Sequence, residues 1–274
     1  MEKPWLKSYP EGVPAEVDVT QYASLIELME EGFSKYAQRD AYALMGKTIT
    51  FGELDRMSAA FGAWLQSKGI KKGARVAIML PNVLQYPVAL AGTLRSGCVV
   101  VNVNPLYTAR ELEHQLKDSG AEVIVILENF ATTLQQVLSK TPVKHVILAS
   151  MGDLLGFPKG AIVNFALRRV KKMVPAYSLP GSLKFNDVMA EGARGQLTKV
   201  EASPDDVAFL QYTGGTTGVS KGATLLHRNL VANMLQLEAW VDAALKDTSR
   251  GPIPEQFIYV CALPLYHVFA LTVN

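Results

Sequence analysis

Apolar side chains follow two patterns along this 274-residue chain, one typical of helices and one typical of buried strands. After Thr50, the apolar residues Leu54, Met57 and Phe61 share one helical face, which predicts a helix. Arg75–Leu80 is then a short apolar run, which predicts a strand buried on both faces. The alternation continues, with helices predicted near 84–95, 108–120 and 131–139 and strands at 98–103, 122–127 and 145–149.

Two helix starts carry the spacing of a capping box. Thr50 precedes Glu53 by three residues, and Thr108 precedes Glu111 in the same way. Short apolar strands separated by helices favour a parallel sheet that is covered on both faces, here over roughly residues 40–150. We therefore predict an α/β fold built from layered, mostly parallel β-sheets with covering helices.

The later part of the chain divides the predicted fold into two subdomains. Residues 1–200 form the first, with an excursion at about 151–200 where the alternation is lost. Residues 201–274 begin the second, with a helix at about 229–245, for which Asn229 is a suitable N-cap. Because the chain stops inside an apolar run, we expect a fragment that is cut within a core segment. Strands are predicted at 207–212, 223–226 and 257–263.

The excursion contains a basic amphipathic segment at 159–174, with five cations and no acidic residue. Helical spacing gathers its apolar side chains on one face and leaves Arg168, Arg169, Lys171 and Lys172 on the other. Two interpretations stay open. The apolar face packs on the sheet with the cations in solvent, or the helix lies on an anionic membrane surface.

Composition limits the classes of function. The net charge of +2, with no long stretch of interleaved basic and aromatic residues, argues against a nucleic-acid partner. Cys98 and Cys261 both lie in apolar runs, which predicts buried free thiols in a reducing compartment. We find no apolar signal core near the N-terminus and no apolar run of membrane-spanning length. We expect a cytoplasmic protein with at most a peripheral contact on the inner face of the membrane.

The segment after the strand at 207–212 carries the candidate chemistry. It reads Tyr212-Thr-Gly-Gly-Thr-Thr-Gly-Val-Ser-Lys-Gly222. Glycines allow positive φ angles and close backbone approach, so that several N–H groups can converge on an anion. Threonine hydroxyls add donors and Lys221 adds a positive charge suited to phosphate. A phosphate-binding loop is therefore predicted, while a plain flexible hairpin stays the structural alternative. The Walker pattern does not fit, because Ser220 precedes the lysine and Gly222 follows it.

The same stretch resembles the AMP-binding signature of the acyl-adenylate-forming enzymes, a family of acyl-CoA synthetases, luciferases and peptide-synthetase adenylation domains. With the segments Leu84–Leu90 and Val101–Thr108, it is similar to the bacterial long-chain fatty acyl-CoA synthetases. The resemblance covers the whole chain but only the N-terminal half of that family's sequence. It implies that a long-chain fatty acid attacks ATP to give an acyl-adenylate with Mg²⁺, and that coenzyme A then displaces AMP.

The resemblance also implies roles for individual residues. Thr213 is expected to be a magnesium ligand through its hydroxyl. The loop residues are expected to hold the β- and γ-phosphates of ATP and to stabilise the departing pyrophosphate. These residues are Thr213, Gly214, Gly215, Thr216, Thr217, Gly218 and Lys221.

A second motif, Ala262–Ala270, contains His267 beside two aromatic residues. Taken alone, such a histidine is usually a satisfied core residue. The resemblance instead implies that His267 orients the acid, and that Tyr266 and Phe269 form the wall of the acyl tunnel. A general-base role is not assigned, because a carboxylate is already ionised at neutral pH. We assign no function to His114 and His145, and a structural one to His227.

The resemblance leaves several features outside the 274 residues. The adenine and ribose motifs, the C-terminal lid domain and the catalytic lysine are expected beyond residue 274, and Lys221 is not that lysine. We therefore expect that this piece alone forms no acyl-CoA. Adenylation of another acid and a non-catalytic nucleotide- or lipid-binding module stay open as alternatives, as do a monomer and a homodimer. The preferred acyl chain length is not predicted.

Overall fold

A seven-stranded sheet organises the chain, and all its neighbouring strands are parallel except the last pair. The structure is a computed structural model that describes residues 2–213, 220–245 and 254–273. The strand order is β7-β6-β5-β3-β4-β8-β9, so the predicted mostly parallel α/β sheet is confirmed. The strands are β3 (Arg75–Met79), β4 (Val99–Asn102), β5 (Val123–Leu127), β6 (His145–Ala149), β7 (Leu183–Lys184), β8 (Val207–Thr213) and β9 (Lys221–Leu226).

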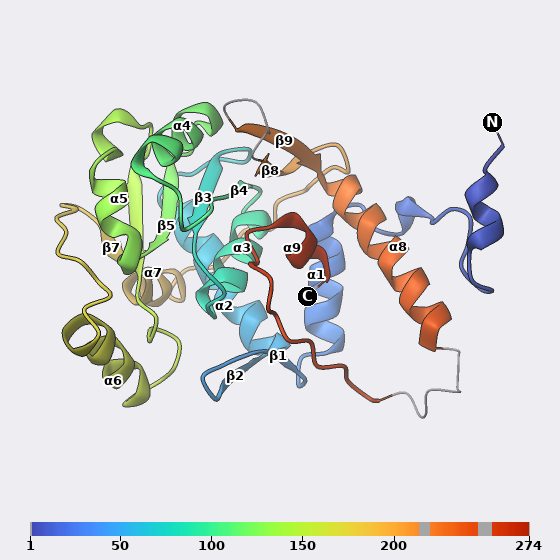
Figure 1. The fold of residues 1–274 in the computed structure, drawn as a ribbon, viewed down its shortest axis with the longest axis horizontal. Helices are drawn as coiled ribbons and strands as arrows, with labels where there is room; N and C mark the ends of the chain where they lie inside the picture. Colours follow the sequence, from blue (N-terminus) through green and yellow to red (C-terminus); the bar gives the residue numbers. More distant parts are fainter. Residues whose placement is uncertain (1, 214–219, 246–253, 274) are drawn as a thin grey trace.

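Helices cover both faces of this sheet (Figure 1). Side chains alternate along β3, where Val76 and Ile78 join the core on one face and Ala77 and Met79 join the core on the other. The first face is covered by α1 (Leu25–Lys35), α2 (Phe51–Ser67), α3 (Gln85–Arg95) and α7 (Phe185–Gly192). The second is covered by α4 (Ala109–Ser119) and α5 (Ala131–Gln135).

Smaller elements complete the molecule. The hairpin of β1 (Asp40–Leu44) and β2 (Lys47–Thr50) is a separate two-stranded sheet. Two helices follow the last strand of the main sheet. They are α8 (His227–Leu245), directly after β9, and the short α9 (Val268–Val273), at the end of the described residues. The remaining helical segments are the 3₁₀ turns at Pro4–Ser8, Val19–Gln21, Glu128–Phe130 and Leu138–Lys140, with α6 (Lys159–Phe165) and the π-helical Ala166–Val170.

Both predicted capping boxes are confirmed. The Thr50 hydroxyl accepts a hydrogen bond from the Glu53 N–H, and the Glu53 carboxylate accepts one from the Thr50 N–H. Thr108 and Glu111 form the same pair at the start of α4, which ends at the left-handed Gly120. Asn229 does not cap in the predicted way, because α8 begins at His227. Its Oδ1 instead accepts from the Leu226 N–H, 2.8 Å away.

The strand predicted at 257–263 is wrong. No residue of this range forms a strand, and Ile258 and Val260 are 91% and 87% exposed. A strand exists only where a neighbour supplies hydrogen-bonding partners, and none of the described strands pairs with this range. The segment follows the body of the molecule as an extended chain. Cys261 is consequently only half-buried, whereas Cys98 is buried as predicted, and both thiols are free.

The sheet continues across the boundary predicted near residue 200. β8 pairs in parallel with β4, so the strand that precedes the loop belongs to the same sheet as the first part of the chain. A division at residue 200 would not follow an edge of this sheet. The assignment of two subdomains stays a prediction.

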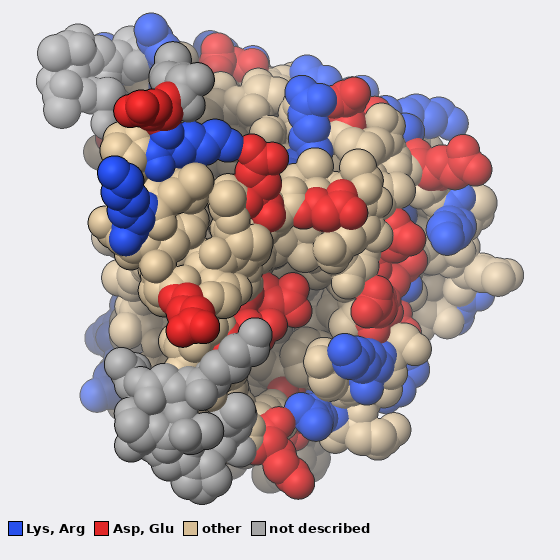
Figure 2. Space-filling model, turned by 90° about the vertical axis from the view of Figure 1, so that its right-hand side faces the viewer, with Lys and Arg blue, Asp and Glu red and all other residues tan. Residues whose placement is uncertain are grey.

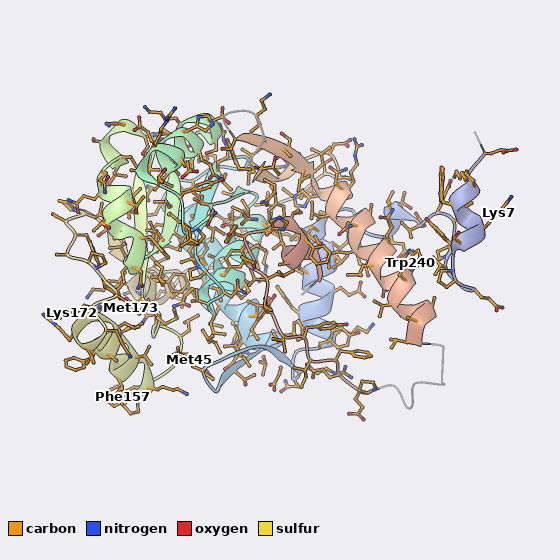
Figure 3. All side chains as sticks on the ribbon, in the orientation of Figure 1. Lys7, Met45, Phe157, Lys172, Met173 and Trp240 are labelled. Atoms are coloured by element: carbon orange, nitrogen blue, oxygen red, sulfur yellow. The ribbon has the colours of Figure 1, made fainter. Side chains whose placement is uncertain are left out.

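The basic amphipathic segment forms α6 and the following π-helical turn at one end of the molecule, far from the N-terminus (Figure 1). On its apolar face, Ile162, Val170 and Met173 are exposed, whereas Val163 packs against the small cluster of Ile49, Leu84 and Leu155. The remaining apolar side chains of this face are half-buried: Ala166, Leu167 and Val174. Figure 3 shows Phe157, Lys172 and Met173 at the same end of the molecule, and Lys7 at the opposite end. The apolar face is thus packed in part and exposed in part, and both interpretations of this helix stay predictions.

Charged side chains of both signs are interspersed on the face that Figure 2 shows. Among the described residues, no helix is long and apolar enough to cross a membrane. The cytoplasmic location and the lack of a nucleic-acid partner stay predictions.

Candidate functional site

The two described ends of the candidate phosphate loop, Thr213 and Lys221, lie at the carboxyl edge of the sheet. Ligands of open α/β sheets characteristically bind at this edge, because the strand ends leave backbone groups and loops there. β8 ends at Thr213, and the antiparallel β9 returns from Lys221, its last cross-strand partner. The predicted residues Gly214, Gly215, Thr216, Thr217 and Gly218 lie outside the described residues.

Thr213 and Lys221 frame the mouth of the loop. Both side chains are exposed. None of the ion pairs found within the described residues involves Lys221, so its ammonium group can meet an anionic ligand without first leaving a carboxylate. The hairpin thus places one hydroxyl and one cation at the two ends of the glycine-rich stretch.

Gly222 belongs to the motif for a packing reason. It pairs with Tyr212 across the hairpin, and a Cβ at Gly222 would lie 2.9 Å from the Tyr212 ring. The Tyr212 hydroxyl is anchored in turn, because it donates to Asp118 Oδ2 on α4 at 2.6 Å. Burial and the neighbouring Asp118 carboxylate raise the pKa of Tyr212, so the hydroxyl stays protonated. This contact fixes the start of the loop against α4.

His114 lies beside the loop, although no function was assigned to it from the sequence. Its Nε2 is 2.9 Å from the carbonyl oxygen of Ser220. This distance is a hydrogen bond when Nε2 carries the proton. His114 thereby ties α4 to the residue that precedes Lys221. Only the pairing of distant segments reveals this contact, so no local sequence pattern could have found it.

The second motif forms a turn and the start of α9. Leu265 is buried and Tyr266 is half-buried, whereas His267 is exposed and Phe269 is 58% exposed. The His267 N–H donates to the carbonyl of Pro264, and its own carbonyl accepts from the N–H of Leu271. The histidine is therefore held in a helix-initiating turn with its side chain at the surface.

Asn82, which follows β3, binds the backbone of the residues that lead into this turn. Its Nδ2 donates to the carbonyls of Cys261 and Leu263, each at 2.9 Å, and its Oδ1 accepts from the Leu265 N–H at 2.8 Å. One side chain therefore fixes five consecutive residues. This segment borders a cavity of about 750 Å³, which is also lined by β1 and residues 82–84. The segment contributes residues 254–261 and Leu265 to the lining.

The two motifs meet through Gln211. Its Nε2 donates to the carbonyl of Tyr266 at 3.0 Å. Gln211 lies two residues before Thr213, and Tyr266 lies one residue before His267. The structure therefore brings together the strand that enters the loop and the turn that carries the histidine, which are more than fifty positions apart in the sequence.

The remaining histidines are structural. His227 is buried, and its Nδ1 accepts from the Leu25 N–H at 3.3 Å, as the sequence analysis expected of a structural residue. Burial lowers the pKa of His227, which keeps the ring neutral as an acceptor. His145 packs edge-on against Trp64, and burial lowers its pKa as well.

The donor set suits a magnesium ion that is held mainly by a nucleotide. No group of three His, Cys, Asp or Glu residues able to hold a metal occurs within residues 2–213, 220–245 and 254–273. Mg²⁺ keeps several waters and is usually bound through one or two carboxylates plus substrate phosphates, and a Ser or Thr hydroxyl is also a ligand in P-loop NTPases. The exposed Thr213 hydroxyl fits such a single protein ligand.

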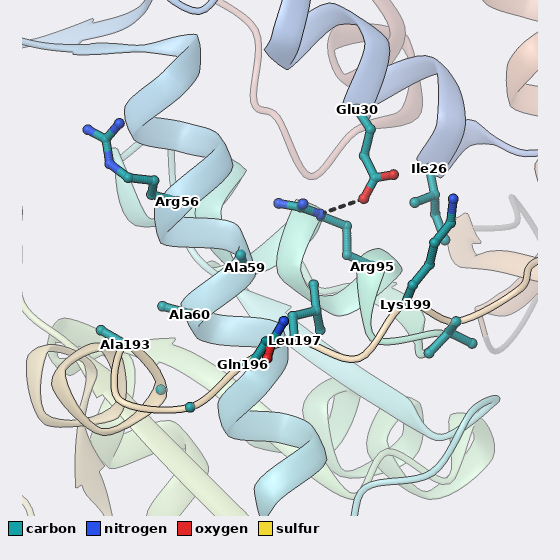
Figure 4. Close-up of a pocket in the computed structure, with 13 residues that line it drawn as sticks. Ile26, Glu30, Arg56, Ala59, Ala60, Arg95, Ala193, Gln196, Leu197 and Lys199 are labelled. Atoms are coloured by element: carbon teal, nitrogen blue, oxygen red, sulfur yellow. Dashed lines mark hydrogen bonds and ion pairs between the residues drawn. The ribbon is translucent and has the colours of Figure 1, made fainter.

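A separate pocket of about 550 Å³ lies at the opposite edge of the sheet, between α1, α2 and residues 192–200 (Figure 4). Arg95 lines it, and this residue ends α3 just before β4 begins. Its guanidinium is paired with Glu30 at 3.1 Å and Asp55 at 2.8 Å. These carboxylates neutralise the Arg95 guanidinium, whereas Lys221 at the candidate site has no ion pair among the described residues. The pocket is therefore a different place from the candidate site and lacks a free cation from Arg95.

Fold and site together define a class of protein, an α/β protein whose glycine-rich loop stands at the ligand-binding edge of a mostly parallel sheet. The model of the AMP-binding enzyme family matches residues 29–274. The chain therefore belongs to the AMP-binding enzyme family, which confirms the resemblance in the motif.

Individual relatives agree with this assignment. The chain is 52% identical over its whole length to a long-chain-fatty-acid–CoA ligase of Escherichia coli O6:H1, covering 48% of that protein, and 54% identical to one of Yersinia pestis, again covering 48%. A solved long-chain-fatty-acid–CoA ligase of Archaeoglobus fulgidus has the same fold, with a TM-score of 0.65 and 23% identity over 97% of this chain and 45% of that one. The chain thus spans about half the length of the curated relatives it matches.

Proposed function

We propose that this chain is the N-terminal part of a long-chain fatty acid–CoA ligase. The observation that carries the proposal is the identity of 52–54% over the whole chain to proteins named long-chain-fatty-acid–CoA ligase. The hairpin of β8 and β9, which ends at the paired Thr213 and Lys221, supports it. A non-catalytic module would not require the loop and the histidine turn to meet at one edge of the sheet.

In the proposed reaction, a carboxylate oxygen of the fatty acid attacks the α-phosphorus of ATP. The bond from this phosphorus to the bridging oxygen breaks, and pyrophosphate leaves. The thiolate of coenzyme A then attacks the acyl carbonyl carbon, and AMP leaves. Catalysis of the first step depends on positioning and on stabilising the charge of the leaving group rather than on covalent chemistry by the protein.

The proposed roles follow the geometry of the edge. Thr213, Lys221 and the loop between them, Gly214, Gly215, Thr216, Thr217 and Gly218, bind the β- and γ-phosphates. Mg²⁺ would supply further positive charge there, with Thr213 as its protein ligand. His267 orients the carboxylate, and Tyr266 and Phe269 line the acyl tunnel. Exposure of His267 and Phe269 is consistent with side chains that contact a ligand rather than a core.

The test is ATP–pyrophosphate exchange by the complete protein with acids of increasing chain length and with aryl acids. We expect exchange with long-chain fatty acids, followed by thioester formation when coenzyme A is added. Exchange with aryl or short acids alone would instead identify an adenylating ligase for another acid. The absence of any exchange would contradict the proposal and favour a binding module. The 274-residue piece alone is expected to form no acyl-CoA.

We further propose that α6 and the following turn contact an anionic membrane surface. The supporting observation is the combination of exposed apolar side chains with exposed cations at one end of the molecule (Figure 3). Amphipathic segments of this kind bury their apolar side chains at the headgroup boundary, and anionic lipids attract their cations. A ligase that draws fatty acids from a bilayer would benefit from this contact.

Vesicle cosedimentation tests the membrane contact. Arg168 must be left intact, because it pairs with the buried Glu128 at 2.9 Å, whereas Arg169, Lys171 and Lys172 are exposed. Reversing these three charges to glutamate should abolish binding to anionic vesicles. The matched control reverses Lys7, Lys71 and Lys199, which changes the net charge equally but leaves this surface intact. Equal loss in both variants, or binding that neither variant alters, would refute the contact.

A further inference from the structure

A chain of buried polar side chains connects the sheet to the turn that carries His267. Tyr86 on α3, Asn102 at the end of β4 and Gln211 on β8 are 1%, 3% and 6% exposed. Asn102 Nδ2 donates to Gln211 Oε1 at 3.0 Å, and Tyr86 donates from its hydroxyl, which lies 2.8 Å from Asn102 Oδ1. At the turn, Gln211 Nε2 donates to the Tyr266 carbonyl, and the Leu265 carbonyl lies 2.8 Å from the Tyr86 hydroxyl, where it shares that hydroxyl's single proton with Asn102 Oδ1.

The direction of these hydrogen bonds is fixed by the turn itself. A backbone carbonyl only accepts, so the amide nitrogen of Gln211 must face Tyr266 and its oxygen must face Asn102. Asn102 must then donate to Gln211 and present its own oxygen to Tyr86. Burial raises the pKa of Tyr86 well above its ordinary value, so the hydroxyl keeps its proton and serves as the donor. Reversing either amide would place two acceptors face to face.

Burying the polar side chains of Asn102 and Gln211 costs folding free energy, which a role in holding the turn would explain. A buried amide without partners destabilises a fold, and apolar residues of similar volume would pack in these strand positions without that cost. The neighbours of Asn102 on β4 and of Gln211 on β8 are indeed apolar. Within the described residues, the polar atoms of Asn102 and Gln211 are satisfied by one another, by Tyr86 and by the turn.

We propose that Gln211 and Asn102 are positioning residues that hold the His267 turn in register with the strand entering the phosphate loop. The inference rests on the proposed function. It adds that these two side chains set the distance between the fatty acid carboxylate and the α-phosphorus of ATP. Adenylation requires the carboxylate and the α-phosphorus to approach to about 3 Å, and small misplacements of either are costly in rate. An amide that contacts Tyr266 from a position two residues before Thr213 couples those two places directly.

The test compares two buried glutamines in the complete protein. Gln211→Met keeps the length of the side chain but removes the donor to the Tyr266 carbonyl. Gln85→Met is the matched control, since Gln85 is also buried and its Nε2 donates to a backbone carbonyl, that of Ser150 at 2.7 Å, away from the turn. We expect Gln211→Met to lower kcat/KM for the fatty acid on the order of tenfold while KM for ATP stays nearly unchanged. Gln85→Met should leave kcat/KM for the acid near that of the wild type.

A conservative variant separates positioning from packing. In Gln211→Glu, burial raises the pKa of the new carboxyl, whose protonated form can donate to the Tyr266 carbonyl. Activity relative to wild type should therefore rise as the pH is lowered, whereas Gln211→Met should show no such recovery. A merely structural role would give both variants the same pH profile relative to wild type, and that result would overturn the proposal.

Hydrogen exchange decides the positioning claim independently of the reaction. Gln211→Met should speed amide exchange at residues 262–267, and Gln85→Met should not. Unchanged exchange there would overturn the inference even if the ligase activity is confirmed. Conversely, faster exchange in a protein that activates no acid would support the coupling while refuting the proposed function.

Discussion

Gly222 and Tyr212 show that the glycines of one motif serve different purposes. The Tyr212 ring occupies the space of a Cβ at Gly222, so this glycine is required by packing and not by a ligand. The composition of the stretch suggested phosphate binding for the motif as a whole. Only the cross-strand pairing of residues 212 and 222 separates the packing glycine from those between residues 213 and 221.

We predict that Gly222→Ala lowers the free energy of unfolding by about 1–3 kcal/mol, because the added methyl group overpacks against the ring. Gly32→Ala is the control, since a Cβ there meets nothing within 4 Å and alanine favours the helix. Urea denaturation of the two variants checks the difference. Equal stability of Gly222→Ala and wild type would show that the ring moves aside without cost.

In the sequence, Asn102 and Gln211 stand out only as polar residues within apolar strands. Asn102 ends an otherwise apolar strand and Gln211 interrupts another, and such polar residues in buried strands call for a partner. The sequence does not reveal which partner, because the contacts join residues 16, 55 and 109 positions apart. The two capping boxes were predictable for the opposite reason, since all their donors and acceptors lie within four residues.

At the scale of elements, α6 illustrates what hydrophobic periodicity can and cannot predict. The spacing correctly indicates a helix, but it does not reveal what covers the apolar face. The structure attaches the helix instead through its smallest residue, because a Cβ at Gly160 would lie 2.2 Å from the carbonyl oxygen of Gly152. The Gly152 N–H also donates to Asn164 Oδ1 at 2.8 Å. Ile162, Val170 and Met173 consequently stay exposed.

We predict that Gly160→Ala displaces α6 and lowers the free energy of unfolding by about 1–3 kcal/mol, because a backbone carbonyl cannot yield as a flexible side chain can. Amide exchange in residues 157–173 should quicken. Ala161→Ser, at the exposed neighbouring position, is the control. Unaltered exchange in Gly160→Ala would mean that the glycine contact does not hold the helix.

Asp153, beneath α6, makes the stability of this region depend on pH. Burial raises its pKa to about 6 from 3.8, with the nearby Glu128 adding to the effect and the Ser150 N–H and Arg168 opposing it. Since the folded-state pKa lies above the unfolded value, the folded state binds the proton more tightly. Stability from this group therefore falls as the pH rises from about 3.8 to about 6.

We predict that Asp153→Asn removes this slope and raises the free energy of unfolding at neutral pH by on the order of 2 kcal/mol. The amide oxygen can still accept from the Ser150 N–H, which the Asp153 carboxylate accepts at 2.7 Å. Urea denaturation across the pH range checks the slope. An identical pH dependence in both proteins would contradict the assignment to Asp153.

The prediction of a strand at 257–263 was wrong because strand formation depends on the whole molecule. Local sequence favours an extended chain there, and the chain is extended, but a strand also needs a neighbour. Strands β3, β4, β5 and β6 were predictable because neighbouring strands lie within the same stretch of alternating elements. The apolar run of β8 was also recognisable, but its parallel pairing with the distant β4 was not. Pairing that depends on distant parts of a molecule cannot be inferred from local pattern.

At the scale of the whole molecule, one sheet edge collects the groups that the proposed chemistry requires. The proposed phosphate-binding residues belong to the β8–β9 hairpin and its connection, and Asn82 and Gln211 hold the histidine turn beside β8 through hydrogen bonds. Family membership, the identity over the whole chain and this arrangement all support the proposal of an adenylating ligase. The central claim is therefore that the hairpin binds the triphosphate of ATP.

The most direct measurement is ATP–pyrophosphate exchange by the complete protein carrying Lys221→Ala together with Thr217→Ala, with a long-chain fatty acid as substrate. Loss of these two groups should weaken ATP binding and lower the exchange rate by at least about a hundredfold, as expected when donors to a developing charge are removed. Lys71→Ala, which removes an exposed lysine elsewhere, should exchange like wild type. Wild-type exchange and ATP affinity in the double variant would contradict the account.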